Sequence, residues 1–293
     1  MSGRMESPVT NQPNHRYLVF TSAGDASRLP KWLQGNRNFD LWVTYYGDEL
    51  GRYRKLADYY NVRKGGKFPN LHHVYQTWPH LLERYEAVLA LDDDIVISAS
   101  AISRLFDIRA EHDLWLLQPA YDPRGKISHA VTRMRRATFL RYTNFVEVGC
   151  VLFRKDKLDV FMRVYDPILV GWGVDWWFLE ALGPELEGKV AISDVVTCVN
   201  PDDRAKGGRR EIEKLQSRAD RIATWERIKT KYNIQSEARG IIEYGALPRS
   251  LAGVAAGVVR WALLSGAAKL RGKRYAGQCR LRTRRRFRVQ SGV

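Results

Sequence analysis

Short apolar runs, each closed by a polar turn, recur along the first third of the chain. The segments 16–24 and 39–48 have this form and are rich in β-branched and aromatic residues. A third run, 88–91, follows a stretch in which apolar residues recur at helical spacing, interrupted by Pro79. Strands that alternate with helices in this way predict a parallel sheet with helices on its faces. We expect Pro79 to kink or divide the helix that contains it.

The remainder of the chain is less regular, but the same two kinds of pattern continue. Strands are predicted at residues 113–121, 144–153 and 190–199, and helices at residues 155–165, 171–183 and 209–231. The second of these helices follows a glycine turn and is rich in aromatic residues. No internal repeat interrupts this order, so an α/β domain is expected.

Three consecutive aspartates, Asp92, Asp93 and Asp94, directly follow the apolar run 88–91. Like charges this close repel one another unless a cation or water lies among them. Alternate residues of an extended chain point to the same side, so Asp92 and Asp94 can address one ligand. Ligands of open α/β sheets collect at the carboxyl ends of the strands. Two interpretations stay open: a solvated acidic loop, or a site for a divalent cation.

Two glycine turns add to this picture. Lys64-Gly65-Gly66-Lys67 precedes the helix that leads to the aspartates, and Gly171-Trp172-Gly173-Val174-Asp175 follows about eighty residues after them. A lysine beside glycines can meet a phosphate as a point charge, because glycine permits close approach of the backbone. The aromatic residues after the second turn either pack in the core or offer a face to a sugar.

The stretches GGKFPNLHHVYQ, ALDDDIVIS, NFVEVGCVLF and GWGVD resemble those of the bacterial and plant family catalogued as domain of unknown function 707. That family is regarded as GT-A-like, the fold of many nucleotide-sugar transferases, and the resemblance covers roughly residues 17–204. It implies a GT-A-like α/β fold, with a mixed, mostly parallel sheet flanked by helices. It also implies a glycosyltransferase that uses a nucleotide-sugar donor and a glycan, lipid or protein acceptor.

The same resemblance implies that Mn²⁺ or Mg²⁺ holds the donor through its diphosphate. Asp94 and Asp92 are then the expected metal ligands, and Asn200 stands where the family often has a histidine. An amide oxygen binds a transition metal more weakly than imidazole does. A non-catalytic nucleotide- or carbohydrate-binding member of the fold is therefore the alternative function.

The resemblance also implies roles for residues near the substrates. Asp175 matches a carboxylate that faces the acceptor and can act as general base. The residues expected to contact substrate are Lys67, Asp92, Asp93, Trp172 and Gly173. From the residues alone, Glu147 is either a site carboxylate or a structural ion-pair partner, because its neighbours in sequence are apolar. His129 is interpreted as structural.

Charge divides the chain. The net charge is +16, and residues 247–293 contain twelve Lys or Arg and no Asp or Glu, so the rest of the chain carries a net charge of only +4. This distribution does not favour a nucleic-acid-binding domain. The tail fits an interfacial helix with a polybasic anchor on an anionic membrane surface. A packed helix followed by a disordered basic end explains the same composition.

The ends of the chain and its cysteines predict where it resides. The polar segment 1–15 lacks the apolar core of a signal peptide, and the three cysteines form no CxxC pair. We therefore expect a cytoplasmic protein, peripheral on the inner face of the membrane if the tail binds lipid. The expected organisation is a disordered N-terminus (1–15), a GT-A-like glycosyltransferase domain (16–246) and the basic tail (247–293).

Overall fold

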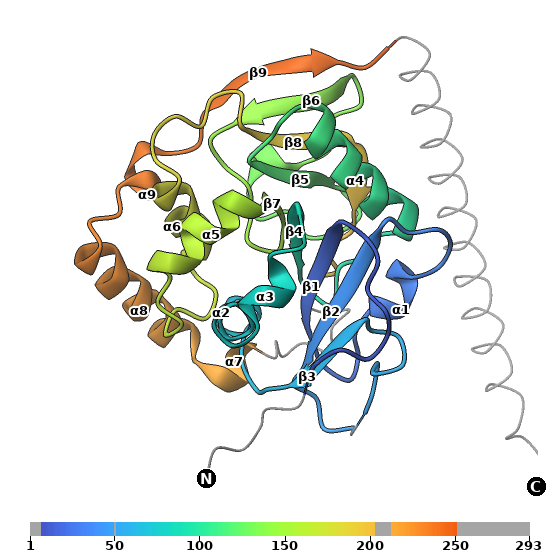
Figure 1. Cartoon of the computed structure of the whole chain (residues 1–293). Helices are drawn as coiled ribbons and strands as arrows, with labels where there is room; N and C mark the ends of the chain where they lie inside the picture. The colour runs from blue at the N-terminus through green and yellow to red at the C-terminus, as the bar shows by residue number, and fades with distance from the viewer. Residues whose placement is uncertain (1–6, 50, 203–211, 251–293) are drawn as a thin grey trace, which may run out of the picture. The chain divides into compact units, whose positions relative to one another are not determined.

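The computed structural model describes residues 7–49, 51–202 and 212–250, and these form one mixed sheet flanked by helices (Figure 1). Within this part of the chain the strand order is β3-β2-β1-β4-β7-β5-β8-β6-β9. The strands are β1 (Tyr17–Ala23), β2 (Phe39–Tyr45), β3 (Tyr59–Val62), β4 (Ala87–Leu91), β5 (Leu116–Tyr121), β6 (Thr138–Thr143), β7 (Cys150–Arg154), β8 (Val190–Cys198) and β9 (Glu243–Pro248).

Strand direction changes at the centre of the sheet. β1 is parallel to β2 and β4, and β2 is parallel to β3. β7 is antiparallel to both of its neighbours, β4 and β5. Beyond it, β5 and β8 are parallel and β6 is antiparallel to β8. The predicted class of fold, an α/β protein with a mixed, mostly parallel sheet between helices, is confirmed.

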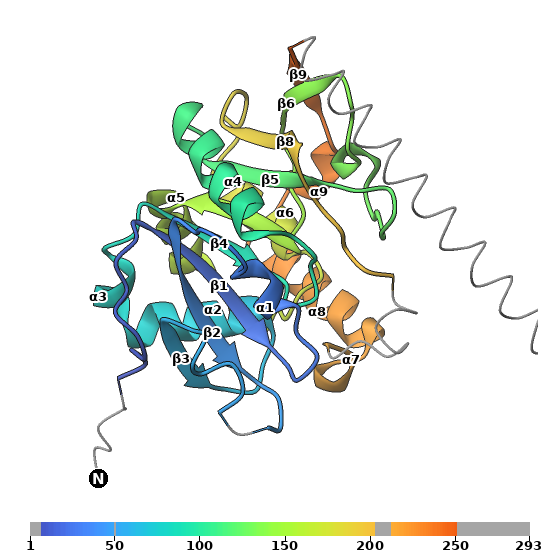
Figure 2. The same ribbon diagram turned by 90° about the vertical axis from the view of Figure 1, so that its right-hand side faces the viewer.

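Helices cover both faces of the sheet. They are α1 (Leu29–Trp32), α2 (Lys67–Thr77), α3 (Pro79–Leu82), α4 (Ala99–Glu111), the 3-10 helix η1 (Ala130–Thr132), α5 (Lys155–Val164), α6 (Val174–Ala181), α7 (Ile212–Leu215), α8 (Arg218–Lys231) and α9 (Ser236–Arg239). Apolar residues of α2, α5, α6 and α8 pack in one core cluster, and those of α1 and α4 pack in another. Figure 2 shows the ribbons of these helices in a second view.

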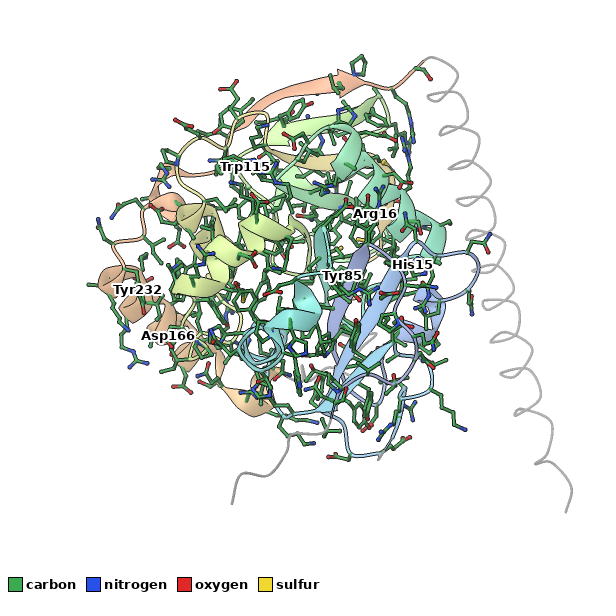
Figure 3. All side chains as sticks on the ribbon, viewed as in Figure 1. His15, Arg16, Tyr85, Trp115, Asp166 and Tyr232 are labelled. Atoms are coloured by element: carbon green, nitrogen blue, oxygen red, sulfur yellow. The ribbon has the colours of Figure 1, made fainter. Side chains whose placement is uncertain are left out.

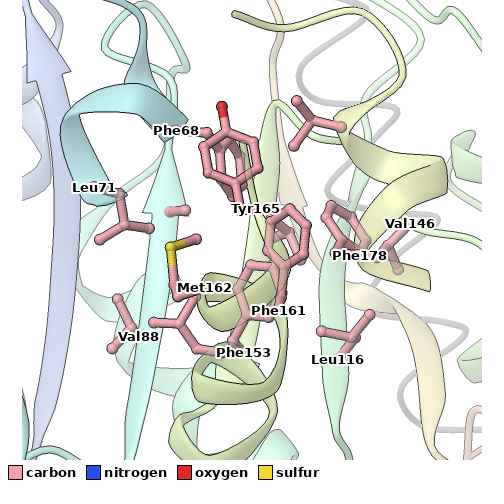
Figure 4. Close-up of a cluster of buried hydrophobic side chains, with 14 of the residues drawn as sticks. Phe68, Leu71, Val88, Leu116, Val146, Phe153, Phe161, Met162, Tyr165 and Phe178 are labelled. Atoms are coloured by element: carbon pink, nitrogen blue, oxygen red, sulfur yellow. The ribbon is translucent and has the colours of Figure 1, made fainter. Parts of the chain in front are cut away.

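Alternation along the strands separates these two clusters. In β1, Leu18 and Phe20 belong to the cluster under α2 and α5, whereas Tyr17 and Val19 belong to the cluster under α1 and α4. Successive side chains of a strand point to opposite faces, so a strand covered on both sides needs an unbroken apolar run. The first cluster is largely aromatic around Phe161, whose ring lies 5.2 Å from that of Tyr165 (Figure 4).

Most of the predicted elements are found. The long predicted helix is divided before Pro79 into α2 and α3, because proline cannot continue the helical hydrogen bonding. The expected strand 144–153 begins only at Cys150, and the helix expected at 209–231 is two helices, with the Ser217 side chain capping α8. The sequence patterns did not identify β3, β6 or α4.

Part of the N-terminal segment expected to be disordered is hydrogen-bonded to the sheet. Val9 forms an antiparallel bridge with Tyr59, and the Tyr60 N–H donates to the Pro8 carbonyl at 2.7 Å. The buried Asp40 carboxylate of β2 accepts hydrogen bonds from the His15 N–H at 3.2 Å and the Tyr85 hydroxyl at 2.7 Å. His15 and Tyr85 are labelled in Figure 3. Residues 7–15 therefore close this edge of the domain.

The domain forms one compact unit up to Leu247, and a second unit begins at Pro248. Residues 251–293 lie outside the described residues, and with them nearly all of the predicted basic tail. Among the helices of the described segments, none combines the length and the apolar character that a membrane span requires.

Candidate functional site

The three aspartates form a tight turn at the carboxyl end of β4. The Ile95 N–H donates to the Asp92 carbonyl at 3.1 Å and closes the turn. Asp93 connects it to the loop after β1, because its carboxylate accepts from the Gly24 N–H at 2.9 Å and its carbonyl accepts from the Arg28 N–H at 2.7 Å. Asp92, Asp93 and Asp94 are all partly buried. The turn is thus fixed by the chain around it.

The structure brings the glycine-rich lysine turn against the aspartates. Lys67 is the first residue of α2, and its ammonium lies 2.7 Å from Asp92 Oδ1. The same ammonium donates to the carbonyls of Val148 at 2.6 Å, Gly149 at 3.2 Å and Ala90 at 3.3 Å. The Lys67 side chain is 8% exposed and that of Asp92 is 42% exposed. Lys67 therefore holds Asp92 in place, and a contact with substrate phosphate stays a prediction.

Asn200 lies at the same edge of the sheet as the aspartate turn. Val96 and Val199 exchange backbone hydrogen bonds of 2.9 and 3.0 Å, so the chain after β8 runs beside the chain after Asp94. The Asn200 carbonyl accepts from the Lys126 N–H at 2.8 Å. The sequence-predicted ligands Asp92, Asp94 and Asn200 thus come from two adjoining segments.

These oxygen donors fit a hard cation better than a zinc-type metal. No group of three His, Cys, Asp or Glu side chains that could hold a metal occurs in segments 7–49, 51–202 and 212–250. Mg²⁺ is commonly bound by one or two carboxylates together with substrate phosphates, and Asp92 and Asp94 supply two. Their role as metal ligands, with Asn200, stays a prediction.

Gly149 joins the aspartate turn to a second group of polar residues. Its carbonyl accepts from the Asp92 N–H at 2.9 Å. A Cβ at this position would lie 2.9 Å from the Tyr121 hydroxyl and 3.3 Å from Asp92 Oδ2, so a larger residue would displace one of them. Burial, and then the negative charge of Glu147, raises the pKa of Tyr121 well above its ordinary value, and the charge of Asp92 acts in the same direction.

Asp175 occupies the first turn of α6, which begins after a left-handed glycine. Gly173 has φ +86°, and a Cβ there would lie 2.1 Å from the Trp225 ring, so both its conformation and its packing require glycine. Asp175 is 8% exposed, and its Oδ1 accepts from the Trp176 N–H at 3.1 Å. Gly173 therefore positions the helix that carries the carboxylate, whereas its predicted contact with substrate is untested.

Burial dominates the electrostatics of Asp175. Loss of solvation, with a smaller contribution from the negative charge of Glu147, raises the pKa of its carboxyl to about 6. The hydrogen bond from Trp176 and the charge of His129 act in the opposite direction. A carboxylate in this state is ionised at neutral pH and more basic than an exposed aspartate.

The third group of the candidate site consists of Glu147 and His129. The sequence indicated a possible site role for Glu147 but not for His129. Glu147 Oε1 accepts from His129 Nδ1 at 3.0 Å and from the Thr132 hydroxyl at 3.0 Å. His129 therefore has a carboxylate partner, and its interpretation as a structural residue stays a prediction. The apolar neighbours of Glu147 were the one available signal, whereas the position of His129 depends on the loop after β5.

Trp172 lies in the turn between α5 and α6 and is exposed to solvent. The guanidinium of Arg218 lies 5.7 Å from the centre of its ring. Trp176 and Trp177 instead pack in the aromatic core. Packing in the core therefore applies to Trp176 and Trp177, whereas only Trp172 is exposed enough to offer a face to a sugar. Stacking of Trp172 on a sugar stays a prediction.

Comparisons with known proteins support no family assignment. A scan with protein-family models gave no match, and no curated protein matched. Among solved structures, S. aureus TarS aligns with 64% of this chain and 36% of its own, at 14% identity and a TM-score of 0.48. TarS 1–349 in complex with UDP-GlcNAc aligns with 67% of this chain and 59% of its own, at 13% identity and a TM-score of 0.46.

A mycobacterial protein aligns with 68% of this chain and 69% of its own, at 12% identity and a TM-score of 0.46. The chain thus spans about a third of TarS and more than half of TarS 1–349. Similarity at this level assigns no function to this chain.

Proposed function

We propose that the protein is a metal-dependent, GT-A-like glycosyltransferase that takes a sugar from a nucleotide donor. One observation carries the proposal. A turn of aspartates at the carboxyl end of β4 is hydrogen-bonded to Gly149, and the charge of nearby Glu147 acts on a buried carboxyl with a raised pKa, Asp175. Transfer of a sugar needs a site of each kind: one for a charged leaving group, and one for a proton.

The aspartate turn is the proposed donor side. Asp92, Asp94 and Asn200 would hold Mn²⁺ or Mg²⁺, which when bound stabilises the negative charge of the departing diphosphate. Lys67 fixes one oxygen of Asp92 at 2.7 Å and so orients the carboxylate. Asp93 holds the turn against the loop after β1, so that this loop borders the donor position.

The start of α6 is the proposed acceptor side. Asp175 accepts the proton of an acceptor hydroxyl, which makes that oxygen a better nucleophile. Its burial keeps bulk water from the carboxylate and keeps the carboxylate basic. The exposed ring of Trp172, three residues earlier, offers a flat apolar face to an acceptor sugar.

Two observations favour the alternative, a non-catalytic module that binds a nucleotide or carbohydrate. Asn200 replaces the imidazole that the family resemblance leads us to expect, which weakens binding of a transition metal. Lys67 already neutralises Asp92, the more exposed member of that ion pair. Both features lower the affinity for a cation without removing the site.

We place the protein in the cytoplasm, with the basic tail attaching it to anionic lipid at the inner face of the membrane. The proposal rests on the composition of residues 247–293, twelve cations without an acidic residue. Each Lys or Arg near an anionic surface contributes about 1 kcal/mol at most, so several together give stable attachment.

A thermal-shift screen of nucleotide sugars, with Mn²⁺ and with EDTA, tests the proposed function. A ligand that binds only the folded protein stabilises it by about 2.7 kcal/mol at a hundred times its Kd. We expect a nucleotide sugar to raise the Tm of the protein in the presence of Mn²⁺ but not in the presence of EDTA. We also expect the nucleoside diphosphate to be released when glycan, lipid or peptide acceptors are added. Binding without release across the acceptor panel would favour the non-catalytic module. A panel with no Tm change would refute both.

A further inference from the structure

The hydroxyl of Tyr121 is buried at the edge of the candidate site. Tyr121 is the last residue of β5 and is 0% exposed. Within the described residues, its hydroxyl has no hydrogen-bond partner. A buried hydroxyl that stays unpaired lowers the stability of the folded protein, so such a group in a native structure needs an explanation. An ordered water is one such partner, provided that the surroundings are polar and leave room for it.

The surroundings of this hydroxyl are polar and open. A Cβ at Gly149 would lie 2.9 Å from the Tyr121 hydroxyl and 3.3 Å from Asp92 Oδ2. Apart from the two chain neighbours of Gly149, no other atom of the described residues would lie within 4 Å of that Cβ. The two oxygens therefore border one space beside the Cα of Gly149. They form no direct hydrogen bond with each other, but one water molecule in this space can reach both.

A water in this space would give Asp92 a second restraint. The Lys67 ammonium lies 2.7 Å from Asp92 Oδ1, and the Asp92 N–H donates to the Gly149 carbonyl at 2.9 Å. These contacts fix the backbone and one carboxylate oxygen. The terminal torsion of an aspartate has no sharp preference of its own, so a single contact leaves the plane of the carboxylate free to turn. A donor at Oδ2 fixes that plane as well.

Water fits this space better than a cation does. The phenol keeps its proton at neutral pH, because burial raises the pKa of Tyr121 well above its ordinary value. An ionised carboxylate only accepts hydrogen bonds, so a molecule between the two groups must accept from the phenol and donate to Asp92. Water does both. A cation would lie near the Lys67 ammonium, which already pairs with the same carboxylate, and repulsion disfavours it.

We propose that a buried water joins the Tyr121 hydroxyl to Asp92 Oδ2 beside Gly149, and that Tyr121 is thereby a positioning residue for Asp92. The phenol donates to the water and the water donates to Oδ2, while Lys67 holds Oδ1. With both oxygens held, the carboxylate is ordered before a ligand arrives, which lowers the entropy cost of binding. This consequence for a nucleotide rests on the proposed function, whereas the water does not.

The water is tested in the full-length protein without ligand. In NMR spectra of glycine-labelled protein, an α-proton of Gly149 should show direct cross-relaxation with a long-lived water, and Gly149→Ala assigns the signal. Urea denaturation of Tyr121→Phe gives a second, independent result. If a water satisfies the hydroxyl, the phenylalanine lowers the urea midpoint, whereas removal of an unpaired hydroxyl would raise it.

The positioning role is tested by calorimetric titration of UDP, GDP, CDP and ADP with Mn²⁺. In Tyr121→Phe we expect about three- to tenfold weaker binding of the nucleotide that wild type binds, at unchanged stoichiometry, as loss of one hydrogen bond to a charged group gives. Tyr17→Phe is the matched control. The Tyr17 hydroxyl is also buried without a partner in the described residues, but it lies at the start of β1, whereas the aspartates follow the end of the parallel strand β4. This variant should bind like wild type.

The two sets of measurements separate this inference from the proposed function. If no nucleotide binds wild type, the proposed function fails, while the NMR signal and the urea midpoint still decide on the water. A missing cross-relaxation signal at Gly149, or a higher urea midpoint in Tyr121→Phe than in wild type, would overturn the inference even in a protein that binds nucleotide. Equal nucleotide affinity in Tyr121→Phe and wild type would refute the positioning role.

Discussion

Replacing Lys67 by methionine tests whether its ammonium belongs to the fold or is available to a ligand. The ammonium contacts four protein oxygens and the side chain is 8% exposed. Breaking a buried ion pair costs about 3–5 kcal/mol when the remaining charge stays buried. Asp92 is 42% exposed, so water can solvate part of the carboxylate left behind. We therefore expect Lys67→Met to lower the free energy of unfolding by about 3 kcal/mol, at the lower end of that range.

Urea denaturation with an unchanged m value measures this loss, and the same glycine turn supplies the control. Lys64 pairs with Asp48 at 2.7 Å, but its side chain is 65% exposed, so Lys64→Met should cost at most about 1 kcal/mol. If the two variants lose the same small amount of stability, the Lys67 ammonium is solvated. The assignment of Lys67 to Asp92 would then be wrong, and a phosphate-binding role would be favoured.

Three further predictions follow from other parts of the site. Ionising buried Asp175 costs free energy, so Asp175→Asn should be more stable than wild type by up to about 3 kcal/mol at neutral pH. Burial raises the pKa of Asp175 from 3.8 to about 6, so this gain in stability should vanish below about pH 4, and denaturation at two pH values measures it. Turnover of Asp175→Asn should fall without loss of donor affinity. Gly173→Ala should cost about 3 kcal/mol by calorimetry, because of the Trp225 ring and the positive φ, whereas Gly183→Ala, with φ +83° and nothing nearby, should cost about 1 kcal/mol. A chain ending at Ser250 should stay folded, bind nucleotide like the full chain and lose the salt-sensitive binding to anionic vesicles. Unfolding of the shortened chain, or vesicle binding of the full chain that salt does not weaken, would contradict the proposed role of the tail.

The central strands were predictable because burial on both faces leaves little choice of sequence. β1, β2 and β4 consist of residues that are buried throughout, so each appears as a mostly apolar run, although Asp40 interrupts it in β2. β3 and β6 are short and mix buried with more exposed residues without regular alternation, which makes their pattern weak. The segment before Cys150 is apolar like a strand but is a loop, and within it the Glu147 N–H donates to the Gln118 side chain and not to a neighbouring strand.

The location of the candidate site could be predicted from the sequence, but the residues that contact its carboxylates could not. The aspartates follow the central strand and therefore lie at the ligand-binding edge, whatever surrounds them. The contact between Lys67 and Asp92 could not be predicted, because it depends on where α2 begins relative to β4 in the folded protein. Local sequence patterns do not give this relative position. His129 and Glu147 are eighteen residues apart on two loops, and only the sheet between β5 and β7 brings them together.

The central claim is that the aspartate turn binds a nucleotide through a metal ion, and calorimetric titration tests it most directly. UDP, GDP, CDP and ADP are titrated into wild type, Asp94→Ala and Asp93→Ala, each with Mn²⁺ and with EDTA. The account predicts a nucleoside diphosphate that binds wild type only with Mn²⁺. It also predicts that this binding is lost in Asp94→Ala and survives in Asp93→Ala, because the Asp93 carboxylate of the wild type accepts a hydrogen bond from the Gly24 N–H. Equal affinity of wild type with and without Mn²⁺ would contradict it.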